Sequence, residues 1–206
     1  MDSTNHDTAV TPTTVLFHLP QGLAVRSVRH SDASSMSRHA TNKKIWDNLR
    51  NRMPHPYTEA DATSWIDFSL DTANHVRSGK WTTEHGSEGP LVPTSWAVTL
   101  DDQVVGSIGL KFGEDIYVRT CEIGYWLGVE HWGKGVMSMV VPEFLKWTWE
   151  TFGILVRVNS ETYEANAASG RVLEKAGFQF EGRRPNMSFK NGRVGAVLMW
   201  GALRPE

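Results

Sequence analysis

Two stretches of this 206-residue sequence combine residue types and spacings that could do chemistry. The first reads Glu122-Ile123-Gly124-Tyr125-Trp126-Leu127 and continues after a short interval as Trp132-Gly133-Lys134-Gly135-Val136-Met137. This pattern predicts a strand, a turn with two glycines and then a helix. Such a turn directs free backbone N–H groups and the positive end of the helix dipole at one point, where a phosphate binds without a basic side chain. The plainer alternative is an ordinary strand-to-helix turn, and the spacing fits neither a Walker P-loop nor a Rossmann fingerprint.

The second stretch reads Asn166-Ala167-Ala168-Ser169 and continues from Arg171 to Phe178. It predicts a short helix from Asn166 to Ala176, which Gly177 ends in a left-handed cap so that the next side chain turns into the core. Asn166 and Ser169 are three residues apart and therefore share one helical face. The alternative reading makes the first a helix cap and the second a small residue without a role.

Together the two stretches resemble the coenzyme A motifs of the GNAT acetyltransferases, in particular the branch of ribosomal-protein alanine and serine N-acetyltransferases. In the superfamily pattern Trp132 takes the first position, Gly135 the fourth and Met137 the last, where a small residue is usual. The resemblance runs from about Leu23 to the C-terminus. It implies an α+β, single-domain GNAT fold, with a mixed central sheet whose two central strands splay apart and are flanked by helices.

The resemblance also implies how acetyl-coenzyme A is bound. Its pantetheine arm pairs with the open backbone of the first central strand, and its diphosphate lies over the glycine turn. The expected coenzyme-binding residues are therefore Ile123, Gly124, Tyr125, Trp126, Leu127, Trp132, Gly133, Lys134, Gly135, Val136, Met137, Asn166, Ser169, Arg171 and Lys175. Solvated surface charge is an equally good reading of the three basic residues in this set.

The implied reaction is direct attack of a neutral amine on a thioester, which requires a proton acceptor, an oxyanion donor and a partner for the departing thiolate. Glu122 starts the cofactor strand and is our candidate base, although a cross-strand pairing role fits it as well. The backbone N–H of Tyr125 or Trp126 is the candidate oxyanion donor. Ser169 is the candidate thiolate partner, because the tyrosine that many relatives carry one helical turn later is Leu173 here.

The sequence does not identify the molecule that accepts the acetyl group. The first two helices and the following loop form the acceptor wall in the family, which makes Trp46, Asn48, Tyr57, Trp96 and Glu122 candidates to touch it. We favour a small-molecule amine. A peptide N-terminus, as in the ribosomal-protein enzymes, and a non-catalytic acyl-coenzyme A-binding module are the alternatives. The oligomeric state is not indicated.

Composition narrows the class of protein. The formal net charge is −2, which gives no reason to expect a nucleic-acid partner, and no apolar run is long enough to span a membrane. Residues 1–14 are polar and lack the features of a secretory signal, so we expect a flexible tail before a domain of residues 15–206 in the cytoplasm. Cys121 is the only cysteine, and the histidines lack metal-ligand spacing, so we expect neither a disulfide nor a metal cofactor.

Several further elements are expected around the motifs. They are a strand at residues 23–28, helices at 32–46 and 58–78, a loop at 81–93, a hairpin of strands at 95–100 and 103–112, a helix at 133–152 bent or interrupted by Pro142, and a final hairpin turning at Asn191-Gly192.

Overall fold

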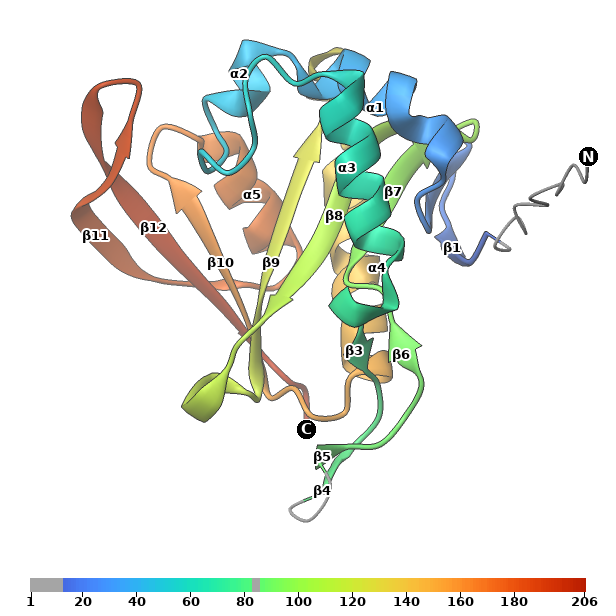
Figure 1. Cartoon of the computed structure of the whole chain (residues 1–206). Helices are drawn as coiled ribbons and strands as arrows, with labels where there is room; N and C mark the ends of the chain where they lie inside the picture. The colour runs from blue at the N-terminus through green and yellow to red at the C-terminus, as the bar shows by residue number, and fades with distance from the viewer. Residues whose placement is uncertain (1–12, 83–85) are drawn as a thin grey trace, which may run out of the picture.

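An eight-stranded sheet forms the centre of the computed structural model, which describes residues 13–82 and 86–206 (Figure 1). Within the described residues β9 and β10 are the one parallel pair of neighbours, and the other neighbours are antiparallel, so the expected mixed sheet is confirmed. In spatial order the strands are β1 (Val15–His18), β2 (Leu23–Arg26), β7 (Ser95–Leu100), β8 (Gln103–Phe112), β9 (Thr120–Leu127), β10 (Arg157–Tyr163), β12 (Arg193–Leu203) and β11 (Gln179–Lys190).

Helices cover both faces of the sheet (Figure 1). The front face carries α1 (Ala33–Ala40), α2 (Lys43–Trp46) and α3 (Glu59–Leu70), and the back face carries α4 (Val136–Thr151) and α5 (Ala167–Lys175). Short 3-10 turns are η1 (His30–Asp32), η2 (Thr72–Asn74), η3 (Asp115–Tyr117) and η4 (Val129–His131). Two small ladders join β3 (Val76–Arg77) to β6 (Leu91–Val92) and β4 (Trp81–Thr82) to β5 (Gly86–Ser87).

Each face has its own apolar core, and β9 shows how the sequence divides between them. Cys121, Ile123 and Leu127 are buried in the back core together with α4 residues such as Phe144. Trp126, which has the opposite parity, packs against the front core under α1 and α3. The two-residue period of a strand therefore places Glu122, Gly124 and Trp126 together on the front face.

Two helix boundaries differ from the sequence expectation. The Thr58–Asp61 capping box at the start of α3 is confirmed, but the helix ends at Leu70 rather than near Gly79, because Asp71 adopts an extended conformation and caps η2. Helix α4 begins at Val136 rather than Gly133, because Gly133 and Gly135 take φ values of +74° and +78°. Both of those values lie outside the right-handed helical region.

The expected interruption at Pro142 is wrong, because α4 runs without a break from Val136 to Thr151. Proline removes one backbone donor and its ring crowds the preceding turn. Here the neighbouring side chains Val140, Val141 and Phe144 are fully buried. Tertiary packing of this face therefore keeps the helix continuous across the lost hydrogen bond.

The N-terminal third is more divided than the sequence pattern predicts. Strand β1 was not expected, the first expected strand ends at Arg26, and the expected helix of residues 32–46 is two helices, with Asn42 capping the second. The expected loop of residues 81–93 contains short strands. Thr14 exchanges hydrogen bonds with Ser27, while residues 1–12 of the expected tail lie outside the described residues.

Both predicted hairpin turns are confirmed. Asp101 and Asp102 connect β7 to β8 with φ values of 47° and 63°, and Asn191 and Gly192 connect β11 to β12 with φ values of 53° and 73°. Two consecutive left-handed residues match the right-handed twist of the flanking strands, which is why aspartate, asparagine and glycine occur at these positions.

A buried ion pair ties the first turn of the front layer to the sheet. Arg26 is 1% exposed and contacts both carboxylate oxygens of Asp32 at 2.8 Å. It also donates to the Asp102 carboxylate at 2.8 Å and to the Asp102 carbonyl at 3.0 Å. The guanidinium thus fixes η1 against the β7–β8 turn.

Candidate active site

The parallel strands β9 and β10 separate after three paired positions. Their register runs from Thr120 opposite Arg157 to Glu122 opposite Asn159 and ends there. Beyond that point β9 stays paired with β8 as far as Leu127, and β10 stays paired with β12 as far as Tyr163. The expected splay of the two central strands is confirmed, and Figure 1 shows them diverging toward the top of the view.

Backbone alternation decides which amides of β9 face this gap. The Gly128 N–H donates to the Val105 carbonyl of β8 at 2.7 Å. Counting back along an antiparallel ladder, the Trp126 amide also faces β8, whereas the Tyr125 and Leu127 amides face the gap. The Ile123 carbonyl, of the same parity, accepts a hydrogen bond from Ser160 of β10 at 3.2 Å. Of the two candidate oxyanion donors, the geometry therefore favours Tyr125 over Trp126.

The turn before α4 presents a run of backbone N–H groups to open space. In the described part of the chain, no protein acceptor takes a hydrogen bond from the amides of residues 133–138, and Gly135 gives the helix no side-chain cap. A Cβ atom added at Gly133 or Gly135 would meet no atom within 4 Å. The first turn of a helix supplies several such donors together with positive dipole potential, so this turn can hold an anion.

The residues around the turn leave it accessible. The indole of Trp132 donates to the Leu127 carbonyl at 2.7 Å, which fixes the turn to the end of β9. Met137, unusual at its motif position, is 6% exposed and packs into the back core, so it does not fill the turn. The exposed basic side chains in this region make no ion pair with any described residue; they are Lys134, Arg171 and Lys175.

Helix α5 follows the predicted second motif closely. The Asn166 side chain caps the helix by accepting from the Ser169 amide at 3.3 Å, so its capping role is real. At the other end Gly177 has a φ of +89°, and Phe178 donates back to the Leu173 carbonyl at 3.0 Å and is 2% exposed. The cap and stop predicted from the sequence are confirmed.

A hydroxyl pair joins α5 to the gap. The Tyr125 hydroxyl lies 2.8 Å from the Ser169 hydroxyl and donates to the Ser169 carbonyl at 3.3 Å. Burial raises the pKa of Tyr125 to about 12, and the hydrogen bond to Ser169 opposes this only in part. The Tyr125 hydroxyl is therefore neutral at ordinary pH and keeps its proton, so it can act as a hydrogen-bond donor toward Ser169.

A cavity of about 820 Å³ connects this hydroxyl pair to the front of the sheet. Its walls come from the loop after α2, from α3, and from β8, β9 and β10. Glu122, Gly124, Tyr125 and Ser169 all line it. Gly124 presents no side chain, and an added Cβ would meet nothing within 4 Å, so the front of β9 is open beside Glu122.

An arginine that the sequence analysis did not single out bridges two carboxylates in this cavity. Arg50 contacts the Glu122 carboxylate at 2.6 Å and the Glu161 carboxylate at 2.9 Å. The two carboxylates are about 30% exposed and Arg50 is 45% exposed. The structure is thus compatible with both interpretations of Glu122. It lies at the cavity, as a catalytic base requires, and it also makes an ion pair, as a pairing role requires.

The acceptor-wall candidates divide three ways. Asn48 and Tyr57 line the cavity. Trp46 does not, because its ring stacks on His55 and lies under the Lys190 ammonium. Trp96 was expected wrongly, because it is 1% exposed in the back core.

Cys121 is the buried strand residue expected from its surroundings. It is 1% exposed, and burial, followed by the charge of Glu122, raises its pKa to about 12. A thiol is nucleophilic as the thiolate, so this environment opposes a covalent role.

Sequence motifs do not indicate Arg50, Glu161 or the hydroxyl of Tyr125 as site groups. Arg50 lies in an irregular segment with no periodic signal, and its partners are 72 and 111 positions away along the chain. For Glu161 the sequence does contain a signal. Asn159 and Glu161 are polar residues two positions apart on a strand, so they share one face of the sheet. Tyr125 was considered for its backbone alone.

Among the described residues no group of three or more His, Cys, Asp and Glu side chains could hold a metal ion. None of the helices in that part of the chain is long and apolar enough to cross a membrane.

The parted strands, the glycine turn and α5 all lie within a stretch that matches a known family. Residues 23–179, more than half of the chain, match the model of the acetyltransferase (GNAT) domain. The chain therefore belongs to the GNAT acetyltransferase family.

Particular relatives extend this finding. The uncharacterized N-acetyltransferase YoaA of Bacillus subtilis is 30% identical over 113 residues, which are 54% of this chain and 63% of that protein, less than two thirds of its length. The ribosomal-protein-S5-alanine acetyltransferase of Vibrio fischeri has a TM-score of 0.72 at 17% identity, over 94% of this chain and 98% of that one. RimJ of Mycobacterium smegmatis, solved in complex with CoA-disulfide, has a TM-score of 0.71 at 21% identity, over 94% and 86%. At these identities the structural likeness shows the fold.

Proposed function

We propose that this protein is an N-acetyltransferase that moves the acetyl group of acetyl-coenzyme A to a primary amine by direct attack in a ternary complex. One observation carries the proposal. The Tyr125–Ser169 hydroxyl pair and the Glu122 carboxylate line one cavity at the open edge of β9, and the free amides of the glycine turn follow the end of that strand in the chain. Each has the chemistry that a different part of this reaction requires.

The residues present fit coenzyme A. The amides of residues 133–138 and the α4 dipole suit its diphosphate, and the exposed Lys134, Arg171 and Lys175 suit its remaining phosphate charge. The gap-facing amides of Tyr125 and Leu127 offer hydrogen bonds to the amide groups of pantetheine, as a neighbouring strand would. When bound, acetyl-coenzyme A supplies an activated thioester carbonyl. The complex of RimJ with CoA-disulfide shows that this fold accommodates the coenzyme in that relative.

Glu122 is our proposed proton acceptor. It lies at the cavity on the front face of β9, where an incoming ammonium can pass its proton to the carboxylate directly or through water. Attack by the neutral nitrogen then forms a C–N bond and breaks the C–S bond. The Tyr125 amide is aimed at the gap and suits the negative charge that develops on the carbonyl oxygen.

Ser169 is our proposed partner of the departing sulfur. The thiolate must end as a thiol, so one proton has to reach it, and the amine loses two protons in total when an ammonium becomes an amide. One of these leaves with the coenzyme thiol and the other goes to solvent through Glu122. The neutral Tyr125, whose pKa burial raises to about 12, has two possible acceptors for its single proton, the Ser169 hydroxyl at 2.8 Å and the Ser169 carbonyl at 3.3 Å. When that proton is directed at the hydroxyl, Ser169 can donate its own proton to the sulfur.

We propose a small-molecule amine as the acceptor. A cavity of about 820 Å³ lies within the usual range of small-ligand sites, roughly 300–1,000 Å³. The alternative acceptor, a protein N-terminus, draws support from the likeness to a ribosomal-protein-S5-alanine acetyltransferase. An amine panel and N-terminal peptides tested side by side separate the two.

Thiol release from acetyl-coenzyme A in the presence of each amine tests the proposal. Glu122→Gln and Ser169→Ala are each expected to lower kcat/KM by roughly 10²–10⁴-fold. Leu203→Ala on an exposed strand end serves as the control. A non-catalytic coenzyme-binding module predicts a thermal shift with acetyl-coenzyme A and no thiol release with any amine or peptide. Unchanged rates in both variants would remove the roles assigned to these side chains.

A further inference from the structure

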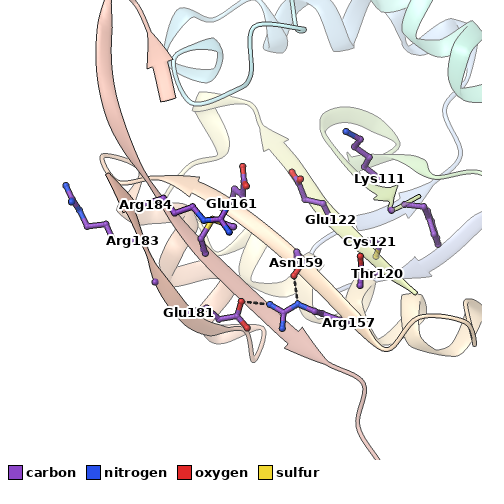
Figure 2. A pocket seen from close by; sticks show the side chains of 14 residues that line it. Lys111, Thr120, Cys121, Glu122, Arg157, Asn159, Glu161, Glu181, Arg183 and Arg184 are labelled. Atoms are coloured by element: carbon purple, nitrogen blue, oxygen red, sulfur yellow. Dashed lines mark hydrogen bonds and ion pairs between the residues drawn. The ribbon is translucent and has the colours of Figure 1, made fainter. Parts of the chain in front are cut away.

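A second cavity adjoins the first on the front of the sheet. Its volume is about 680 Å³, and β8, β9, β10, β11 and β12 all contribute to its lining (Figure 2). The two cavities share Lys111, Phe112, Glu122 and Glu161. A molecule whose amine lies at Glu122 therefore has room to extend its remaining atoms into this second cavity.

Strand register orders the charged side chains across the floor of the second cavity. Lys111 of β8 lies opposite Glu122 of β9, and Glu161 of β10 lies opposite Met199 of β12. Met199 in turn lies opposite Gly182 of β11, two residues before Arg184. Lys111 and Arg184 thus flank the two carboxylates, as Figure 2 shows.

Two groups of charged side chains on this floor form ion pairs among themselves. Arg157 pairs with Glu181, and both lie over the bare backbone of Gly201, where a Cβ atom would collide with them. Arg50 is shared between Glu122 and Glu161. That triad has two negative charges and one positive charge, so it has one negative charge in excess.

Two cations of the second cavity have no carboxylate partner among the described residues. They are Lys111 and Arg184. The neighbouring Arg183 also borders the cavity but differs, because its side chain pairs with Glu164 at 2.6 Å and extends away from Glu122 and Glu161 in Figure 2. The floor therefore offers one unmatched negative charge at Glu122 and Glu161, with unmatched positive charges on both sides of it.

We propose that the acceptor is a small primary amine that also carries an anionic group, such as a carboxylate or a phosphate. This inference rests on the proposed function and specifies its acceptor. The ammonium matches the excess charge of the Arg50–Glu122–Glu161 triad. Neighbouring strands are about 4.8 Å apart, so an anionic group two or three bonds from the nitrogen reaches Lys111, and a more distant one lies toward Arg184. Polyamines, which have no anion for these cations, are poor acceptors.

Matched amines that differ only in the anionic group test this proposal by thiol release. Aspartate and glutamate are compared with their diamides, and 2-aminoethyl phosphate with ethanolamine. We expect kcat/KM to be roughly tenfold or more higher for the anionic member of at least one pair, since two charge-assisted contacts are gained. The preference should shrink as ionic strength rises from 0.01 to 0.5 M.

The variants Lys111→Met and Arg184→Gln should reduce that preference mainly through KM, and Arg183→Gln should leave it unchanged. Calorimetric titration of the same amines into the protein with coenzyme A gives a second readout. Binding that depends on Lys111 and Arg184 without turnover would support the anion site and count against the proposed function. Turnover with equal kcat/KM for anionic and neutral members would overturn the inference and leave the proposed function standing. A preference for N-terminal peptides over every small amine would also overturn it.

Discussion

Replacing Gly135 by alanine should separate coenzyme binding from stability. Gly135 has a φ of +78° and borders the run of free amides before α4. Gly192, at the β11–β12 turn, has a φ of +73°, and an added Cβ meets nothing within 4 Å at either residue. Gly192→Ala is therefore a matched control. It introduces the same backbone strain at a position far along the chain from the glycine turn before α4.

The magnitudes follow from these conformations. A left-handed conformation costs a non-glycine residue about 1–2 kcal/mol. A domain of this size loses about 2–4 °C in Tm per kcal/mol, so both variants should melt about 2–8 °C below the parent protein. Acetyl-coenzyme A at a hundred times its Kd stabilises the parent by about 2.7 kcal/mol, which corresponds to about 5–11 °C. Losing one charged hydrogen bond of about 1.5–3 kcal/mol weakens binding about tenfold or more.

The assay is a thermal melt with and without a fixed concentration of acetyl-coenzyme A, supported by calorimetric Kd values. Gly192→Ala should retain the full ligand-induced shift from its lower starting Tm. Without ligand, Gly135→Ala should have a Tm as low as that of Gly192→Ala. It should lose at least half of the Tm increase that acetyl-coenzyme A produces in the parent protein. If Gly135→Ala keeps both the shift and the Kd of the control, the turn does not hold the diphosphate and the reasoning is refuted.

Three further outcomes test other parts of the structure. Tyr125→Phe should lower kcat about fivefold, the value of one neutral hydrogen bond of ~1 kcal/mol, without moving the pH profile below pH 10, because a group with a raised pKa of about 12 stays protonated there; a basic limb below pH 10 that shifts in the variant would contradict this. Arg26→Met should cost about 3–5 kcal/mol in urea unfolding, since it leaves a buried carboxylate unpaired, and a loss under ~1 kcal/mol would show that the ion pair is dispensable. Gly128→Ala should cost about 1–3 kcal/mol, because its Cβ would lie 2.6 Å from the ring of His39, and His39→Ala should recover part of that loss in a double-mutant cycle.

Local signals in the sequence predicted the parts of this fold that depend on few residues. The Asn191-Gly192 turn, the Thr58 cap and the Gly177 stop were correct because glycine, asparagine and threonine at those positions have one favoured local geometry. Of the bend or interruption expected at Pro142, the interruption is wrong, because burial of its neighbours outweighs one missing hydrogen bond.

The candidate site was predictable only where a motif names it. The glycine turn, Glu122 and Ser169 each belong to a contiguous segment with a recognisable pattern, and in the structure Glu122 and Ser169 line the same cavity. Arg50 approaches Glu122 from a loop 72 positions earlier, and no local pattern encodes that contact. Trp96 failed for a related reason, since a strand residue faces either the core or the cleft, and the run from Trp96 to Thr99 is buried throughout, so alternation does not distinguish the two faces.

The parted strands leave backbone groups of β9 without a neighbouring strand, and this decides what kind of molecule can pair with them. Backbone amides inside a protein are almost always paired. Past Glu122 and Asn159 the ladder ends, and side chains take over some of the lost bonds: Ser160 donates to the Ile123 carbonyl, and Trp132 donates to the Leu127 carbonyl. Both of these side-chain hydrogen bonds satisfy backbone carbonyl acceptors of β9. Among the residues that the structure describes, the gap-facing amides of Tyr125 and Leu127 gain no such partner, so a molecule that enters the gap has to bring hydrogen-bond acceptors, and the carbonyl groups of a pantetheine thioester are acceptors of this kind.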